Sequence, residues 1–370
     1  MKRRIRKTLV FIMFAVFISA VVMLMIQFIP EAPVSEMEHA RACLASASRN
    51  KADTYSSKLY NEAKSSYDSA MANWQRENTK FIYFRDYEKV RIYAVQAAEK
   101  ASKADESSIS NTSSLKKKIA QKIDSLNNLV SEINRLFTTY PLESETRNRI
   151  SKGKMLLEEA KVSYNKGHYL QSNRNITDSE YLLTTSFQSA SEDLRTYFKL
   201  FPSWKKWMEK TIADSKRSGE YSIIIDKFSH KLTIYQKGVV KYEFDAEFGK
   251  NWVGDKRVRG DHATPEGMYK ITKKFDRGRT KYYKALLLDY PNAEDIEKFK
   301  SEIARGTLPG TARIGGLIEI HGNGGKGIDW TEGCIALTDK EMDLLYKVTK
   351  VGTPVTIIGS ASELSVVLKK

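Results

Sequence analysis

Hydrophobic and polar positions follow three successive patterns along this chain of 370 residues. Residues 8–29 are uncharged and almost wholly apolar. Over residues 35–215, apolar side chains recur every three or four positions, which is the period of amphipathic helices. From residue 221 onward they recur in short runs with a period of two, which is typical of β-strands. The patterns predict an α+β chain with an apolar N-terminal helix, an all-α helical module and a β-rich C-terminal domain.

The apolar segment, residues 8–29, is long enough to cross a membrane. As a helix it would rise about 33 Å, against a hydrocarbon core of about 30 Å. Residues 1–7 carry five positive charges, so we expect them to form a cytoplasmic basic tail and to leave the rest of the chain outside the cytoplasm. A cleaved signal peptide is the alternative, but its apolar region usually has only about 7–15 residues. We predict a single-pass signal anchor in the cytoplasmic (inner) membrane.

The region from 35 to 215 has few glycines and prolines and is predicted to be a helical bundle or a tetratricopeptide-like module. One long apolar face steps by threes and fours from Leu115 to Leu136. Residues 111–114 are expected to cap the start of this helix, and Pro141 to end it. Reactive side chains do not gather in this region, so we expect it to act as a spacer or to bind a protein partner.

The C-terminal domain, residues 218–360, is predicted to be rich in β-strands. Its apolar runs predict strands at residues 221–225, 232–235, 239–244, 285–290, 316–322 and 354–359. A helix is expected over residues 338–350, because Thr338 and Glu341 have the spacing of a capping box.

The formal net charge of +16 is spread along the chain. It forms no dense basic patch with interleaved aromatic residues, which argues against a nucleic-acid partner. A diffuse positive field instead suits an anionic setting such as a cell-wall polymer or a membrane surface. The two cysteines, Cys43 and Cys334, are too few for a disulfide framework.

Two rare residues, His321 and Cys334, share the stretch EIHGNGGKGIDWTEGCIALTD. We expect His321 at the end of a strand, and Cys334 after a glycine-rich loop and before a helix. A cysteine nucleophile needs a base within hydrogen-bond reach and backbone N–H groups that face the developing oxyanion. Gly333 lets the chain turn tightly before the cysteine. This order favours a cysteine–histidine acyl-transfer site, and the alternative is a buried cysteine in a glycine-rich turn.

Several stretches of this domain resemble the L,D-transpeptidase (YkuD-type) catalytic domain. The segments IHG and TEGCIAL resemble its signature around the histidine and the cysteine, GDHATPEGMYKI resembles its TPEG segment, and LDYPNAED resembles its YPNA variant. The motifs occur in the family's order over about residues 220–360. The resemblance implies a β-sandwich-like fold, peptidoglycan stem peptides as substrates, and chemistry that needs no metal or organic cofactor.

The resemblance also implies a role for each matching residue. Cys334 would attack a donor tetrapeptide and form a thioester, with release of the terminal D-amino acid. His321 would be the base, oriented by the backbone carbonyl of Gly322, and the N–H groups of Gly333 and Cys334 would form the oxyanion hole. An amine acceptor would give a crosslink, whereas water would make the enzyme an L,D-carboxypeptidase or another hydrolase. An inactive peptidoglycan-binding scaffold is the third alternative.

The chain departs from the family pattern at two positions beside the cysteine. Glu332 stands where the family commonly has histidine, and Ala336 where it commonly has arginine. Because an arginine there would hold a carboxylate, another cation is expected to replace it. The candidates are Arg259, Arg313 and Lys326. We predict Trp330, Thr331 and Arg313 as substrate contacts, although Trp330 could instead pin the loop.

Overall fold

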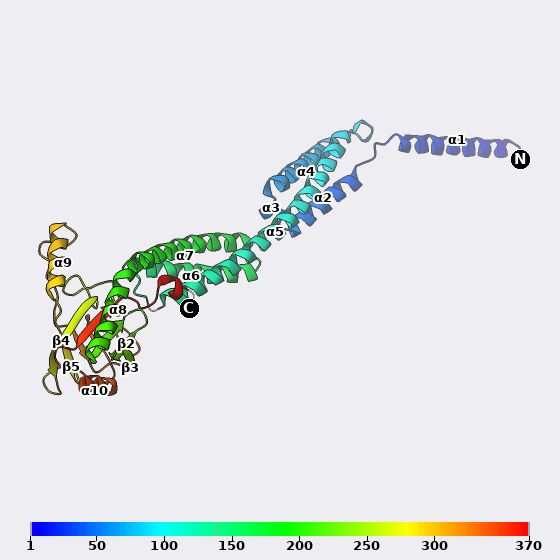
Figure 1. The fold of residues 1–370 in the computed structure, drawn as a ribbon. Coiled ribbons are helices and arrows are strands. Elements are labelled where there is room, and N and C mark those ends of the chain that lie inside the picture. Colours follow the sequence, from blue (N-terminus) through cyan, green and yellow to red (C-terminus); the bar gives the residue numbers. More distant parts are fainter. Residues whose placement is uncertain (1, 139, 369–370) are drawn as a thin grey trace. The chain divides into compact units, whose positions relative to one another are not determined.

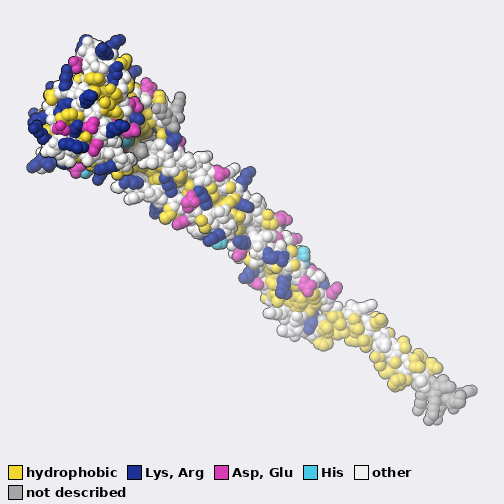
Figure 2. Space-filling view, turned by 90° about the horizontal axis from the view of Figure 1, so that it is seen from below, with side chains coloured by type: hydrophobic (Ala, Val, Ile, Leu, Met, Phe, Trp, Pro, Cys, Tyr) yellow, Lys and Arg dark blue, Asp and Glu magenta, His cyan; other side chains and the backbone are white. Residues whose placement is uncertain are grey.

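The computed structural model describes residues 2–138 and 140–368. Its first helix, α1 (Lys2–Gln27), contains the stretch Thr8–Gln27, which has a mean hydropathy of 3.0. Figure 2 shows hydrophobic side chains on the surface of this stretch. The stretch is long and apolar enough to cross a membrane. A membrane anchor and a signal sequence share these properties, so the anchor stays a prediction.

The region after α1 is built of helices, as predicted (Figure 1). They are α2 (Val34–Arg49), α3 (Ala52–Tyr55), α4 (Ser57–Asn78), η1 (Ile82–Phe84), α5 (Glu88–Phe137), α6 (Ser144–Asn165), α7 (Tyr169–Phe198) and α8 (Phe201–Ser218). The chain divides into two compact units. One comprises Met1–Asp124 and Glu158–Ile176, and the other Ser125–Leu157 and Thr177–Lys370. Helices α5, α6 and α7 therefore contribute residues to both units.

The helix expected to begin after residues 111–114 begins much earlier, because α5 already starts at Glu88. The predicted cap is therefore wrong. Asn111 donates a hydrogen bond from Nδ2 to the carbonyl oxygen of Tyr55 at 2.9 Å, so its side chain binds a neighbouring segment. A polar residue that favours caps stays inside a helix when another element accepts its hydrogen bond. The predicted end is confirmed, since α5 stops before Pro141.

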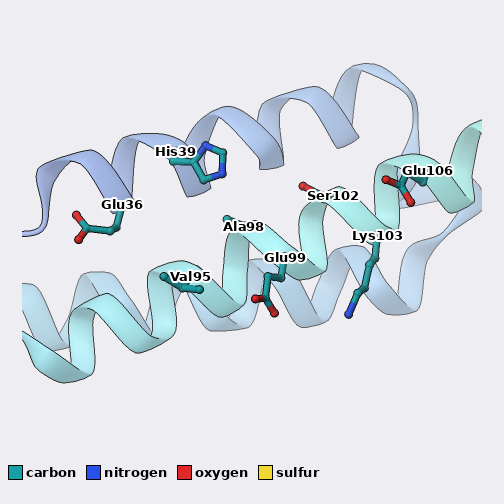
Figure 3. A pocket seen from close by; sticks show the side chains of 8 residues that line it. All are labelled: Glu36, His39, Val95, Ala98, Glu99, Ser102, Lys103 and Glu106. Atoms are coloured by element: carbon teal, nitrogen blue, oxygen red, sulfur yellow. The ribbon is translucent and has the colours of Figure 1, made fainter.

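In the first unit, α2, α4 and α5 pack through small side chains. The buried residues of this core are Met37, Ala40, Ala70, Tyr87, Val90, Ala94, Ala97 and Ala98. Small side chains at the contact let helix axes approach closely. A surface cavity of about 430 Å³ remains between α2 and α5. Figure 3 shows the carboxylates of Glu36 on α2 and of Glu99 and Glu106 on α5 among the side chains that line it.

The second unit contains a sheet whose described residues form eight strands in the order β3-β2-β1-β8-β4-β5-β6-β7. The strands are β1 (Tyr221–Asp226), β2 (Lys231–Gln236), β3 (Val239–Asp245), β4 (Gly267–Phe275), β5 (Ala285–Leu288), β6 (Glu319–His321), β7 (Ile335–Ala336) and β8 (Pro354–Ile358). Three helices accompany them, α9 (Ala293–Ala304), α10 (Asp339–Val348) and α11 (Leu364–Val367). Every predicted strand is present, and α10 begins at the predicted capping box of Thr338 and Glu341.

The two ends of this sheet meet beside the cysteine. Just after β3, Glu247 exchanges backbone hydrogen bonds with Ala336 of β7, at 3.0 and 2.8 Å. Gly249 forms a second bridge, with Thr331. The sheet therefore curls around a single apolar core to which strands from both of its ends contribute. This arrangement confirms the predicted α+β fold with a sandwich-like C-terminal domain.

Buried polar contacts attach helices α7 and α8 to the sheet. Glu266, from the TPEG segment, accepts hydrogen bonds from Tyr197 Oη at 2.7 Å and from Trp204 Nε1 at 2.9 Å. Its carboxylate also pairs with Lys227 Nζ at 2.7 Å, and both side chains are buried. A buried carboxylate with this many donors is well satisfied, and loss of any donor would be costly. The glutamate of this motif therefore has a structural role here.

Candidate active site

His321 is the last residue of β6, and its side chain is fully buried. Its Nδ1 lies 2.6 Å from the carbonyl oxygen of Gly322. A carbonyl oxygen only accepts, so Nδ1 must carry the proton, and Nε2 keeps its lone pair. Nε2 is buried and has no hydrogen-bond partner among the described residues. The backbone therefore presents a neutral imidazole with one basic nitrogen unoccupied.

Two aromatic rings enclose the imidazole. Tyr282 stacks on it, with ring centroids 3.5 Å apart and planes within 3° of parallel. Trp330 meets it edge-on, with a centroid distance of 5.8 Å. A lysine lies over each of these rings, Lys281 at 5.0 Å from the Tyr282 centroid and Lys326 at 3.2 Å from that of Trp330. The two rings shield the imidazole from water, and the two lysines bring positive charge close to it.

Cys334 follows a tight turn, and the residue directly before it, Gly333, has a backbone conformation that favours glycine. Gly333 has a φ of +123°, and a Cβ there would lie 2.5 Å from the carbonyl oxygen of Ala263. Thr331 Oγ1 donates to the Cys334 carbonyl at 2.7 Å and accepts from the Gly333 amide at 3.2 Å. The thiol itself donates to the carbonyl oxygen of Leu317, with Sγ and O 3.6 Å apart. The turn is thus shaped by Thr331, and the thiol is not bonded to His321 in this state.

The protonation states follow from burial. Desolvation, aided by the charges of Lys281 and Lys326, holds the pKa of His321 at about 4, although its bond to Gly322 opposes the shift. Desolvation also raises the pKa of the Cys334 thiol from 9.0 to about 11. At neutral pH both groups are therefore uncharged. A nucleophilic attack by this thiol would therefore need to be coupled to loss of its proton, because no preformed pair of thiolate and imidazolium is present.

The loop between His321 and Cys334 is held by two carboxylates. Glu247 accepts from Trp330 Nε1 at 2.7 Å and from a backbone amide of the loop. Asp329 accepts from the Phe248 amide at 2.8 Å, and its other oxygen lies 2.9 Å from His230 Nε2. These contacts tie the loop to the segment that follows β3. Glu247 therefore orients Trp330 against the imidazole of His321, a role with no local signal in the sequence.

The C-terminal domain matches a known protein-family model. Residues 220–357 match the model described as the L,D-transpeptidase catalytic domain, YkuD. The C-terminal domain belongs to the L,D-transpeptidase family. A comparison with curated proteins found no match.

Several solved structures are similar to the L,D-transpeptidase domain. One is Bd1075 of Bdellovibrio bacteriovorus, 22% identical with a TM-score of 0.30, where the match covers 41% of this chain and 52% of the other. Another is an L,D-transpeptidase from Mycobacterium smegmatis, which is 15% identical with a TM-score of 0.25, and the match covers 38% of this chain and 58% of the other. L,D-transpeptidase 1 of Mycobacterium tuberculosis is 14% identical with a TM-score of 0.25, and the match covers 38% of this chain and 62% of the other. The chain thus matches about half to three-fifths of the length of these proteins.

The three predicted substrate contacts of the L,D-transpeptidase domain lie in different environments. Trp330 lies against His321, and Thr331 is buried with its hydroxyl engaged inside the turn. Arg313 is exposed, and its carbonyl oxygen accepts from the Arg259 amide at 2.8 Å. Ala336 is fully buried in β7. The position of the family arginine therefore lies inside the sheet.

Lys281, which the sequence did not bring forward, is a further candidate cation. It lies between β4 and β5, far along the chain from the cysteine. Its charge lowers the pKa of both the Cys334 thiol and the His321 imidazole. Only the folding of that loop over the site reveals it. Among residues 2–138 and 140–368, no three His, Cys, Asp or Glu side chains gather to hold a metal ion.

Proposed function

We propose that this protein is a membrane-anchored peptidoglycan L,D-transpeptidase that uses Cys334 as nucleophile and His321 as base. One observation carries the proposal. In a domain that matches the L,D-transpeptidase family, the imidazole is held in the tautomer that leaves Nε2 basic and buried, with no hydrogen-bond partner in the part of the chain that the structure describes. A neutral base of this kind can take the proton of a neutral thiol.

The proposed reaction has two halves. In the first, Sγ of Cys334 leaves the Leu317 carbonyl and attacks the donor peptide carbonyl while its proton passes to Nε2. The tetrahedral intermediate collapses, the C–N bond breaks, and the imidazolium returns the proton to the leaving D-amino acid amine. In the second, Nε2 takes a proton from an acceptor amine as that amine attacks the thioester. The thiolate leaves and regains this proton, which restores the neutral pair.

Backbone amides would stabilise the two tetrahedral intermediates. We assign this role to the N–H groups of Gly333 and Cys334, which adjoin the nucleophile. The Gly333 amide rests on Thr331 Oγ1 through a long bond of 3.2 Å. An oxyanion is a stronger acceptor than a hydroxyl, so the amide would turn to it as charge develops. Thr331 would then hold the turn through its remaining bond to the Cys334 carbonyl.

We assign the binding of the donor's carboxylate to Lys281. Its charge acts on the pKa of both Cys334 and His321, and its ammonium lies over the ring of Tyr282, which in turn stacks on the imidazole. A cation there can pair with a peptide carboxylate as the substrate enters. Lys281 would then replace the arginine that the family commonly has at the position of Ala336.

Incubation with purified muropeptides tests the proposal. Mass spectrometry of the intact protein should detect a thioester adduct with tetrapeptide donors, and product analysis should detect amine-linked crosslinks. Cys334→Ala should abolish both, whereas the matched control Cys43→Ala, on α2, should retain both. An adduct on the Cys334→Ala protein would overturn the assignment of the nucleophile. Release of the D-amino acid with water as the only acceptor would instead make the protein an L,D-carboxypeptidase.

Anchoring is a separate part of the proposal. The stretch Thr8–Gln27 would span the cytoplasmic membrane as a single-pass helix, with the catalytic domain outside the cytoplasm. Flotation of the full chain with lipid vesicles after an alkaline carbonate wash should show stable membrane association. A chain that remains at the bottom of the gradient would show that the segment is not an anchor.

A further inference from the structure

The turn between α4 and α5 exposes a cluster of aromatic side chains. This aromatic tip comprises Phe81, Ile82, Tyr83 and Phe84. The side chains of Phe81 and Phe84 are 66% and 75% exposed. The Phe81 ring lies 5.7 Å from that of Tyr83 and 6.1 Å from that of Phe84. Large apolar side chains that gather on a surface mark an interaction site, because their hydrophobic surface stays exposed to water unless a partner covers it.

The tip lies at the end of the helical bundle that α1 enters. Only six residues, 28–33, separate α1 from α2. Arg91, in the first turn of α5, donates to the carbonyl oxygen of Glu31 at 3.0 Å. Ala32 packs against the same core as Tyr87, which follows the tip. All of these residues belong to the first unit, and Figure 1 shows the turn and the start of α2 at the same end of the bundle.

The charges around the tip balance one another. Lys80 pairs with Glu77 at 2.6 Å. Arg85 donates to backbone carbonyls, and Asp86 accepts from the backbone amide of Glu88. Neither a polyanion nor a polycation would therefore be favoured as a partner. Aromatic rings on a turn without net charge instead suit the head-group region of a bilayer, where such side chains are enriched.

We propose that the aromatic tip inserts into the surface of the bilayer that α1 crosses, and so gives the helical module a second contact with the lipid. This inference rests on the proposed anchoring of the full chain. The tip enters the lipid through apolar side chains, so the contact is insensitive to salt. The first contact is the membrane-spanning helix α1, and the second is the aromatic tip. Together they hold this end of the helical module against the membrane.

A fluorescent label on the full chain tests this contact. In a protein without its native cysteines (Cys43→Ser and Cys334→Ala), Phe84→Cys places a thiol for an environment-sensitive dye at the tip. The matched control is Ile109→Cys on α5, about 30 Å beyond the start of that helix. The native Ile109 is 55% exposed. Both proteins are reconstituted in vesicles of phosphatidylethanolamine and phosphatidylglycerol. Quenching by iodide in the water and by nitroxide on the lipid acyl chain is measured for each.

The expected result is that the dye at position 84 is several-fold less quenched by iodide and several-fold more quenched by the lipid nitroxide than the dye at position 109. Raising the salt concentration should leave this difference unchanged. If the chain floats with the vesicles but both dyes are equally exposed to iodide, the tip contact is overturned and the anchor stands. If the chain does not float, both the anchor and the tip contact are overturned.

Discussion

The pKa of about 11 for the Cys334 thiol predicts that the folded protein resists alkylation. The thiolate is the form that reacts with iodoacetamide. At pH 7 a pKa of about 11 leaves about one thiol in 10⁴ ionised, against about one in 10² for a thiol with its ordinary value of 9.0. The folded protein should therefore react about 100-fold more slowly than the same chain unfolded in urea.

The assay uses a Cys43→Ser protein, in which Cys334 is the only thiol. Rates are measured by mass spectrometry from about pH 6 to about pH 10. The logarithm of the rate should rise with a slope near one throughout and show no plateau. Replacing His321 with alanine should change the rate by no more than a few-fold, since a neutral imidazole does not stabilise a thiolate. A plateau near neutral pH that disappears in His321→Ala would reveal a preformed ion pair and refute this reasoning.

Three further predictions concern single residues. Gly333→Ala should remove activity and lower the free energy of unfolding, measured by urea titration, by about 3 kcal/mol, because its Cβ would meet the Ala263 carbonyl oxygen at 2.5 Å. In the control Gly310→Ala the added atom meets open space, so the same titration should show little effect. Because the pKa of His321 is about 4 when folded and 6.5 as its ordinary value, the unfolded chain binds more protons between these pH values. Stability should therefore fall by about 3 kcal/mol as the pH drops through this window, and His321→Gln should lack this loss in urea unfolding followed across pH. Lys281→Met should raise the KM for carboxylate-bearing donors by about tenfold while Lys281→Arg retains the wild-type value, and an equal KM for all three proteins in a steady-state assay would remove Lys281 from the binding site.

Local patterns were sufficient to predict much of the segment from His321 to the start of α10. The strand that ends at His321, the glycine before Cys334 and the capping box of Thr338 and Glu341 all depend on neighbours within a few residues. Each was visible in the sequence, and the strand and the capping box are present in the structure. The same reasoning failed at residues 111–114, because a hydrogen bond to Tyr55, remote in the chain, overrides the local preference of Asn111.

The sequence by itself determined the order of the elements and brought forward His321 and Cys334 as the candidate pair, because hydrophobic period, turn chemistry and motif spacing are properties of short stretches. Only the tertiary structure decided what surrounds that pair. Tyr282 and Lys281 come from the β4–β5 connection, and Glu247 from the segment after β3. Tyr282 and Lys281 reach the site because β5 pairs with β6, which places Ala285 opposite His321. Glu247 reaches it because the curled sheet brings its two ends together. Burial within that closed sheet also sets the pKa of the thiol and of the imidazole, since desolvation depends on every element packed around a group and not on its neighbours in the chain.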